Sequence, residues 1–112
     1  MGIRVLKMNP GEKQPRWIYV DNTLEALQGE VGGYIETVPL EGTAAVMIVN
    51  EEGRNLGLSL TYHDLVYGWL VGPILLVGVD GEEFCDLPLR YGKIWSERIK
   101  LGMEQVLKGV ER

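Results

Sequence analysis

The sequence predicts an α+β domain in which a mixed or mainly antiparallel sheet of about five or six strands packs against two helices. One helix is short and lies in the N-terminal half, and the other is longer and C-terminal. Runs of β-branched and aromatic residues recur between turn residues, which include many of the 15 glycines. Two other segments repeat apolar residues at helical spacing. With 112 residues there is room for one core, so we expect a single domain over residues 1–112.

The N-terminal part of the chain predicts a β-hairpin. Residues 3–8 and 17–20 are rich in β-branched or aromatic side chains, which are enriched in strands. The intervening stretch NPGEKQ contains Pro10 and Gly11, which favour a turn. We therefore expect the two strands to pair directly.

The next twenty residues, DNTLEALQGEVGGYIETVPL, predict a short helix followed by a third strand. Asn22 and Glu25 have the spacing of a capping box at a helix N-terminus. Gly32 and Gly33 predict the C-terminus, because glycine takes the left-handed conformation without a Cβ penalty. One apolar stripe runs along the helix: Leu24, Leu27 and Val31.

The second half predicts three more strands and the long helix. Residues 43–49 and 73–79 are nearly continuous apolar runs, as in central strands covered on both faces. Asp80-Gly81 predicts a tight turn to a short strand over residues 82–85. The helix is expected over residues 93–110, where one face collects Trp95, Ile99, Met103, Val106 and Val110. Glycine at position 102 should weaken that helix by roughly 1 kcal/mol relative to alanine.

Residues 54–72 fit no regular period, and we expect an irregular segment with one helical turn. The stretch YHDLVYGWL within it fits either a short helix or an aromatic loop. Long irregular segments of small domains are often the functional ones.

Composition narrows the classes of function. Cys85 is the only cysteine and His63 the only histidine, so one chain can form neither a disulfide nor a His-rich or thiolate metal centre. Acidic neighbours should raise the pKa of the Cys85 thiol, as suits a structural cysteine. No apolar run approaches the ~20 residues of a membrane span, and no signal peptide is recognisable. We therefore expect a cytoplasmic protein without metal or cofactor.

The net charge of −5 conceals a marked segregation of charge. Residues 1–20 carry +3 and residues 90–112 carry +3, whereas residues 21–89 contain twelve acidic residues and one arginine, a net −11. Either the basic ends fold back onto the acidic middle of the same chain, or they pair with the middle of a second copy.

Several stretches in order, DNTLEALQ, VGGYIETVPL, VMIVNEEGRNLGL and ILLVGVDGEEFCDL, resemble a family of small phage and bacterial proteins catalogued as domain of unknown function 3846. The resemblance covers residues 3–89, and after Leu87 a longer basic helix replaces the family's short acidic tail. It implies an origin in phages, plasmids or other mobile elements, where small accessory proteins often modulate host or defence machinery. It implies no activity and no functional residues.

The ligand-binding residues that we expect are Arg54, Tyr62, His63 and Trp69. Aromatic rings and a guanidinium can stack on and clamp a nucleotide-like ligand, although packing in the core or an interface is the alternative interpretation of the aromatic residues. His63 stands beside Asp64, but no serine or cysteine nucleophile accompanies them. We therefore expect no catalytic residue.

The favoured hypothesis is a non-enzymatic binding or accessory protein of phage or mobile-element type. It would be a homo-oligomer that sequesters a nucleotide-like ligand or an inhibitory target for counter-defence, in the host cell cytoplasm if phage-encoded. One alternative is an acidic protein that mimics nucleic acid and so inhibits a host protein. The other is an enzyme that uses His63 and Asp64. At this net charge we expect no direct binding of nucleic acid.

Overall fold

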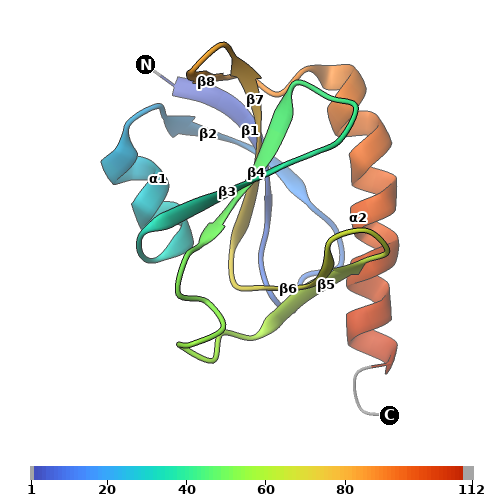
Figure 1. Cartoon of the computed structure of the whole chain (residues 1–112). Helices are drawn as coiled ribbons and strands as arrows, with labels where there is room; N and C mark the ends of the chain where they lie inside the picture. The colour runs from blue at the N-terminus through green and yellow to red at the C-terminus, as the bar shows by residue number, and fades with distance from the viewer. Residues whose placement is uncertain (1, 110–112) are drawn as a thin grey trace.

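The computed structural model describes residues 2–109, in which two helices flank a mainly antiparallel six-stranded sheet (Figure 1). This confirms the α+β class. The elements in chain order are β1 (Gly2–Met8), β2 (Arg16–Asp21), α1 (Leu24–Val31), β3 (Ile35–Pro39), β4 (Ala45–Asn50), β5 (Leu60–Asp64), β6 (Gly68–Val71), β7 (Ile74–Asp80), β8 (Glu83–Cys85) and α2 (Leu89–Gly109).

The main sheet has the order β2-β1-β7-β4-β3, with β8 paired to β7. The predicted β1–β2 hairpin is confirmed, as is the tight turn from β7 to β8. β7 lies between β1 and β4 and pairs antiparallel with both. Its first five residues are all buried, in agreement with the continuous apolar run.

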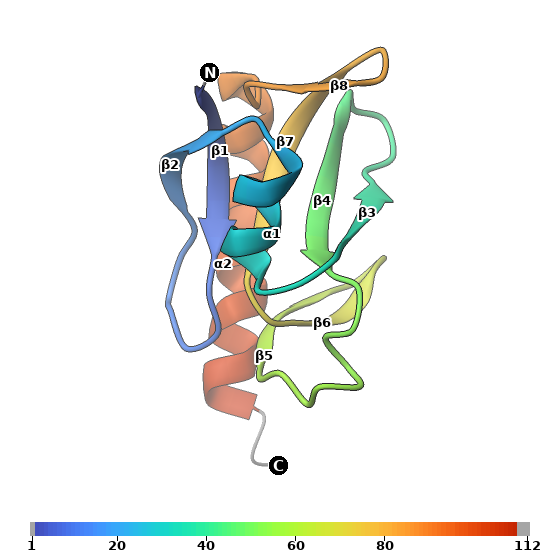
Figure 2. The same cartoon turned by 90° about the vertical axis from the view of Figure 1, so that its left-hand side faces the viewer.

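Each face of the sheet has its own core, because successive side chains of a strand point to opposite faces. Ile74 and Leu76 of β7 pack in the cluster with α2, and Leu75 and Val77 pack in the cluster with α1. Figures 1 and 2 show the sheet between the two helices.

Helix α1 begins one residue later than the capping-box pattern predicts. Thr23 is the N-cap, and its hydroxyl accepts a hydrogen bond from the Ala26 backbone N–H at 3.1 Å. Asn22 instead donates to the Phe84 carbonyl at 2.9 Å, which ties the start of α1 to β8. The predicted end is confirmed, since Gly32 has a φ of 82°.

Within the segment 54–72 that was predicted to be irregular, β5 and β6 form a second sheet, so the prediction is wrong for these strands, whereas residues 54–59 contain no helix or strand. β5 and β6 pair antiparallel, with a register shift between Leu60 and Tyr62. The hairpin packs against α2, away from the ladder of the main sheet. No helical turn separates its strands; residues 65–67 form the turn, and Gly68 has a φ of 82°.

Helix α2 starts at Leu89, four residues before the predicted residue 93. Pro88 precedes it, and the Pro88 carbonyl accepts hydrogen bonds from the N–H groups of Tyr91 and Gly92 at 3.0 Å each. The predicted apolar face is confirmed, because Trp95, Ile99, Met103 and Val106 are buried. Val110 lies outside the described residues.

Two ion pairs join the basic ends of the chain to its acidic middle. Lys7 Nζ lies 2.6 Å from Glu30 Oε1, and Arg98 Nε lies 2.8 Å from Asp64 Oδ1. These contacts support the interpretation in which the ends fold back within one chain.

Gly102 lets α2 approach β5, so the expected gain from alanine at this position is reversed. A Cβ at Gly102 would overlap the carbonyl oxygen of His63 and the ring of Tyr62. We expect Gly102→Ala to destabilise the protein by about 1–3 kcal/mol through overpacking, despite alanine's higher helix propensity, as measured by urea denaturation.

The matched control is Gly29→Ala in α1, where a Cβ meets nothing within 4 Å. This variant should be more stable than the wild type by roughly 0.4–1 kcal/mol. A stabilising Gly102→Ala would contradict the close packing of β5 on α2.

Candidate ligand-binding site

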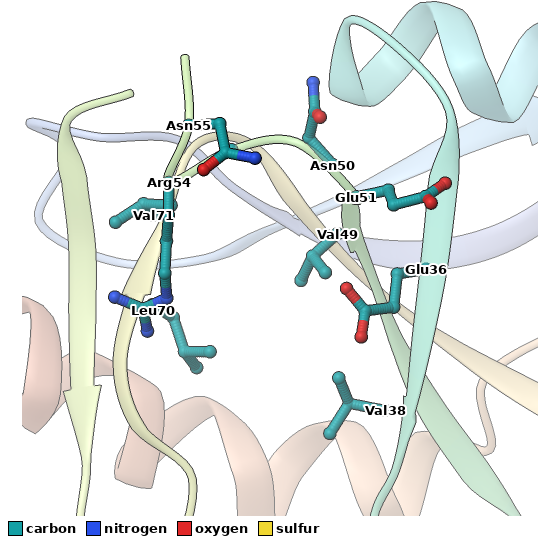
Figure 3. A pocket seen from close by; sticks show the side chains of 10 residues that line it. Glu36, Val38, Val49, Asn50, Glu51, Arg54, Asn55, Leu70 and Val71 are labelled. Carbon is teal, nitrogen blue, oxygen red and sulfur yellow. The ribbon is translucent and has the colours of Figure 1, made fainter. Parts of the chain in front are cut away.

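A cleft of about 370 Å³ lies between the main sheet and the β5–β6 sheet (Figure 3). Strands β3 and β4 form one wall, β6 forms the other, and the turn after β4 closes one end. The lining residues are Glu36, Val38, Val49, Asn50, Glu51, Gly53, Arg54, Asn55, Leu70 and Val71. Clefts of this size are within the range that holds small ligands.

The main-sheet wall follows from the register of β3 and β4. Glu36 pairs with Val49, and Val38 lies two residues further along β3 on the same face. Because β3 is the last strand of the sheet, its cleft-facing residues have no further strand beside them. The wall therefore combines aliphatic side chains with one carboxylate.

A network of hydrogen bonds shapes the turn that carries Arg54. Asn50 is buried; its amide donates to the Val31 carbonyl at 3.1 Å, and its side-chain oxygen accepts from the Glu52 N–H at 2.7 Å. Gly53 leaves little room, because a Cβ there would lie 3.0 Å from Val71 Cγ2. This turn is thus held against both α1 and β6.

Of the three charged residues that line the cleft, Glu36 and Arg54 are opposite in sign and lie on opposite sides of it. Figure 3 shows the Glu36 carboxylate facing the cavity from β3 and the Arg54 guanidinium on the far side, beside Leu70. Arg54 donates to the Trp69 carbonyl, which orients it. Within residues 2–109, neither Glu36 nor Arg54 takes part in an ion pair. Both charges are thus available to a ligand.

The four predicted ligand-binding residues do not form one site. Arg54 lines the cleft, whereas Tyr62 is fully buried in the core beneath α2, with its hydroxyl 3.5 Å from Met47 Sδ. The Tyr62 ring is therefore inaccessible to a ligand in this structure. His63 and Trp69 do not line the cleft.

His63 and Trp69 instead form a pair of rings across the β5–β6 hairpin. They are direct cross-strand partners, with centroids 4.4 Å apart and planes tilted by 48°. His63 Nδ1 lies 3.3 Å from Gln105 Oε1. The ring contact therefore links β5 to β6, and the contact of His63 with Gln105 links the hairpin to α2. Neither ring can stack on a ligand in the cleft.

Asp64 does not polarise His63. Its carboxylate accepts two hydrogen bonds from Arg98, both at 2.8 Å, and further ones from the N–H groups of Val66 and Tyr67. Burial alone would raise the pKa of Asp64, but the bonds from Arg98, Tyr67 and Val66 outweigh it and hold the pKa below its usual value. The geometry of a histidine–carboxylate dyad is thus missing at these two residues.

The acidic residues outside the cleft also have structural or scattered positions. Glu30 and Asp64 are paired with basic side chains. The acids of the β7–β8 turn lie at the top of Figure 1, far from the turn after β4 at the bottom.

Burial, with Asp80 and Asp86 nearby, raises the pKa of the Cys85 thiol, as the sequence predicts. Among the described residues, no group of three or more His, Cys, Asp or Glu could hold a metal ion.

Sequence comparison identifies the family. The model of the family described as "Domain of unknown function (DUF3846)" matches residues 3–99, which is most of the chain. The protein therefore belongs to this family, as the resemblance predicts. The match continues past Leu87 into the first half of α2, so the divergence expected after Leu87 is not found over residues 88–99.

No curated protein and no solved structure matches the chain. Neither described helix combines the length and the apolar character required to cross a membrane.

Arg54 is the one cleft residue among the four predicted from the sequence. Glu36 was missed because an acidic residue on an edge strand has no local pattern that distinguishes a site from ordinary solvent exposure. Asn55 was missed because an asparagine in a turn is equally common where no site exists, so its local sequence does not mark it. Their convergence arises only when the second sheet packs beside β3 and β4.

The Asp64–Arg98 pair should contribute to stability in a pH-dependent way. We expect Asp64→Asn to lower the free energy of unfolding at neutral pH by about 2–3 kcal/mol, the scale of hydrogen bonds to charged groups. The loss stays below that of a fully buried pair because the Arg98 side chain is 41% exposed. Because the folded pKa is depressed, the wild-type advantage is complete above about pH 4 and is lost as the pH falls through the folded pKa.

The measurement is chemical denaturation at several pH values. Glu12→Gln is the control, since the Arg16–Glu12 pair at 3.4 Å is partly exposed and should be worth less than about 1 kcal/mol. Equal losses for the two variants would contradict a special role for Asp64.

Proposed function

We propose that this protein is a non-enzymatic binding protein whose small-molecule ligand occupies the cleft between the two sheets. The observation that carries the proposal is the placement of Glu36 and Arg54 on opposite walls, each without an ion-pair partner among the described residues. Charged groups without ion-pair partners can orient a ligand, and the aliphatic side chains of the cleft walls can bury its apolar part.

The charges of the cleft define the ligand class. Two carboxylates, Glu36 and Glu51, and one guanidinium, Arg54, give a local net charge of −1. The net negative charge of the cleft would repel a polyphosphate. Among the nucleotide-like ligands expected from the sequence, we therefore propose a nucleoside-sized molecule that is neutral or zwitterionic. Its donor or cationic group would face Glu36, and its acceptor group would face Arg54 and Asn55.

The biological role that we propose is sequestration. A binding protein of phage or mobile-element type would lower the free concentration of such a ligand without transforming it, which is one route to counter-defence. The absence of an assembled dyad at His63 and Asp64 supports binding rather than catalysis by these residues.

The test is a thermal-shift screen followed by calorimetry with nucleosides, nucleobases, amino acids and nucleoside triphosphates. A ligand at 100 times its dissociation constant should stabilise the protein by about 2.7 kcal/mol, with nucleosides favoured over triphosphates. Glu36→Gln and Arg54→Ala should each weaken binding at least about tenfold, the scale of one lost charge-assisted hydrogen bond.

Glu82→Gln is the matched control, because Glu82 is exposed in the β7–β8 turn and outside the cleft. It should bind as the wild type does. The proposal fails if no compound of the panel stabilises the protein, or if Glu36→Gln and Arg54→Ala bind a ligand with unchanged affinity.

A further inference from the structure

An apolar groove of about 550 Å³ lies between the β5–β6 turn and α2, outside the cleft described above. Its apolar side chains are strongly exposed: Leu65 is 93% exposed, Leu101 65% and Val66 63%. Gly102 and the paired Asp64 and Arg98 complete its lining with His63 and Gln105. Three exposed aliphatic side chains around one concavity indicate a surface that binds another apolar group.

A complementary apolar side chain lies on the same face of α2. Ile94 is 67% exposed and precedes Leu101 by seven residues, so the two lie on one face about 10 Å apart along the helix. The groove lies beside Leu101, whereas Ile94 stands beyond it toward the start of the helix.

We propose that the groove binds a second copy of this chain, with the two α2 helices antiparallel. In that arrangement Ile94 of each protomer inserts into the groove of the other, beside Leu101, Leu65 and Val66. One surface supplies both the protruding side chain and the groove, so the interface is isologous and closes as a two-fold dimer.

The charges at the two ends of this face support a second copy as the occupant. Arg90 lies four residues before Ile94, and Glu104 lies three residues after Leu101. An antiparallel register that places Ile94 opposite Leu101 therefore brings each Arg90 close to the Glu104 of the partner subunit. The Arg90 guanidinium lies 4.9 Å from the centroid of the Tyr91 ring.

The proposed register brings the two Glu97 side chains of the dimer close to each other. Glu97 lies midway between Ile94 and Leu101, is exposed, and would approach its own copy near the two-fold axis. Two like charges there weaken the dimer, so removal of this charge should strengthen it. The proposal is independent of the ligand proposal, because no α2 residue lines the cleft.

Sedimentation velocity over a range of protein concentrations tests the dimer. Leu101→Asp and Ile94→Asp should each raise the dimer dissociation constant at least about tenfold, and Glu97→Gln should lower it. Leu24→Asp is the control, since Leu24 is 60% exposed but lies on α1, and it should dimerise as the wild type does. Far-ultraviolet circular dichroism checks that each variant remains folded.

A charge exchange tests the register. Arg90→Glu and Glu104→Arg should each weaken the dimer, and the double variant should recover most of the wild-type affinity, because the exchange restores both opposite-charge contacts. A wild-type chain that remains monomeric up to roughly 1 mM would overturn the proposal and leave the groove for a different partner. Single variants that weaken the dimer without recovery in the double variant would overturn the antiparallel register.

Discussion

The contact between β5 and α2 determines where the second sheet lies. β5 has no hydrogen-bonded neighbour in the main sheet, so its position depends on side chains and on close packing. Gly102 allows the approach, and the Asp64–Arg98 pair fixes it with two hydrogen bonds of 2.8 Å. The Arg98 guanidinium also lies 4.2 Å from the centroid of the Trp95 ring. The close approach at Gly102 and the Asp64–Arg98 ion pair thus position the hairpin without backbone hydrogen bonds from β5 to the main sheet.

Both recognition surfaces proposed for this protein follow from that placement. The side of the hairpin that faces β3 and β4 encloses the cleft with Glu36 and Arg54. The turn of the hairpin carries Leu65 and borders the groove on α2. One supersecondary unit, packed against the main sheet on one side and a helix on the other, therefore creates two concave surfaces of different character. The first is charged and aliphatic, and the second is largely apolar.

Local signals in the sequence account for most of the fold and for little of the candidate site. Asp80-Gly81 and Gly32 identified a hairpin and a helix end because each turn conformation is a property of a few adjacent residues. The β5–β6 hairpin was not predicted for two reasons. The register shift after Leu60 interrupts the alternation of apolar and polar residues, and the burial of β5 residues depends on their contact with α2, which local sequence does not show. Glu36 became recognisable as a site residue only through its position opposite Arg54, which no spacing in the sequence encodes.

The strand order carries a consequence for how the chain assembles during synthesis. β1–β2 and β3–β4 are local hairpins, but β7, which separates them in the sheet, is made only after residue 73. Until it inserts, neither hairpin has its inner neighbour, and both expose an unpaired backbone edge. Asp64 likewise awaits Arg98 from the final helix. The main sheet is therefore completed only by the long-range pairings of β7 with β1 and β4, which slow folding and require β7 to be synthesised before the two hairpins can join.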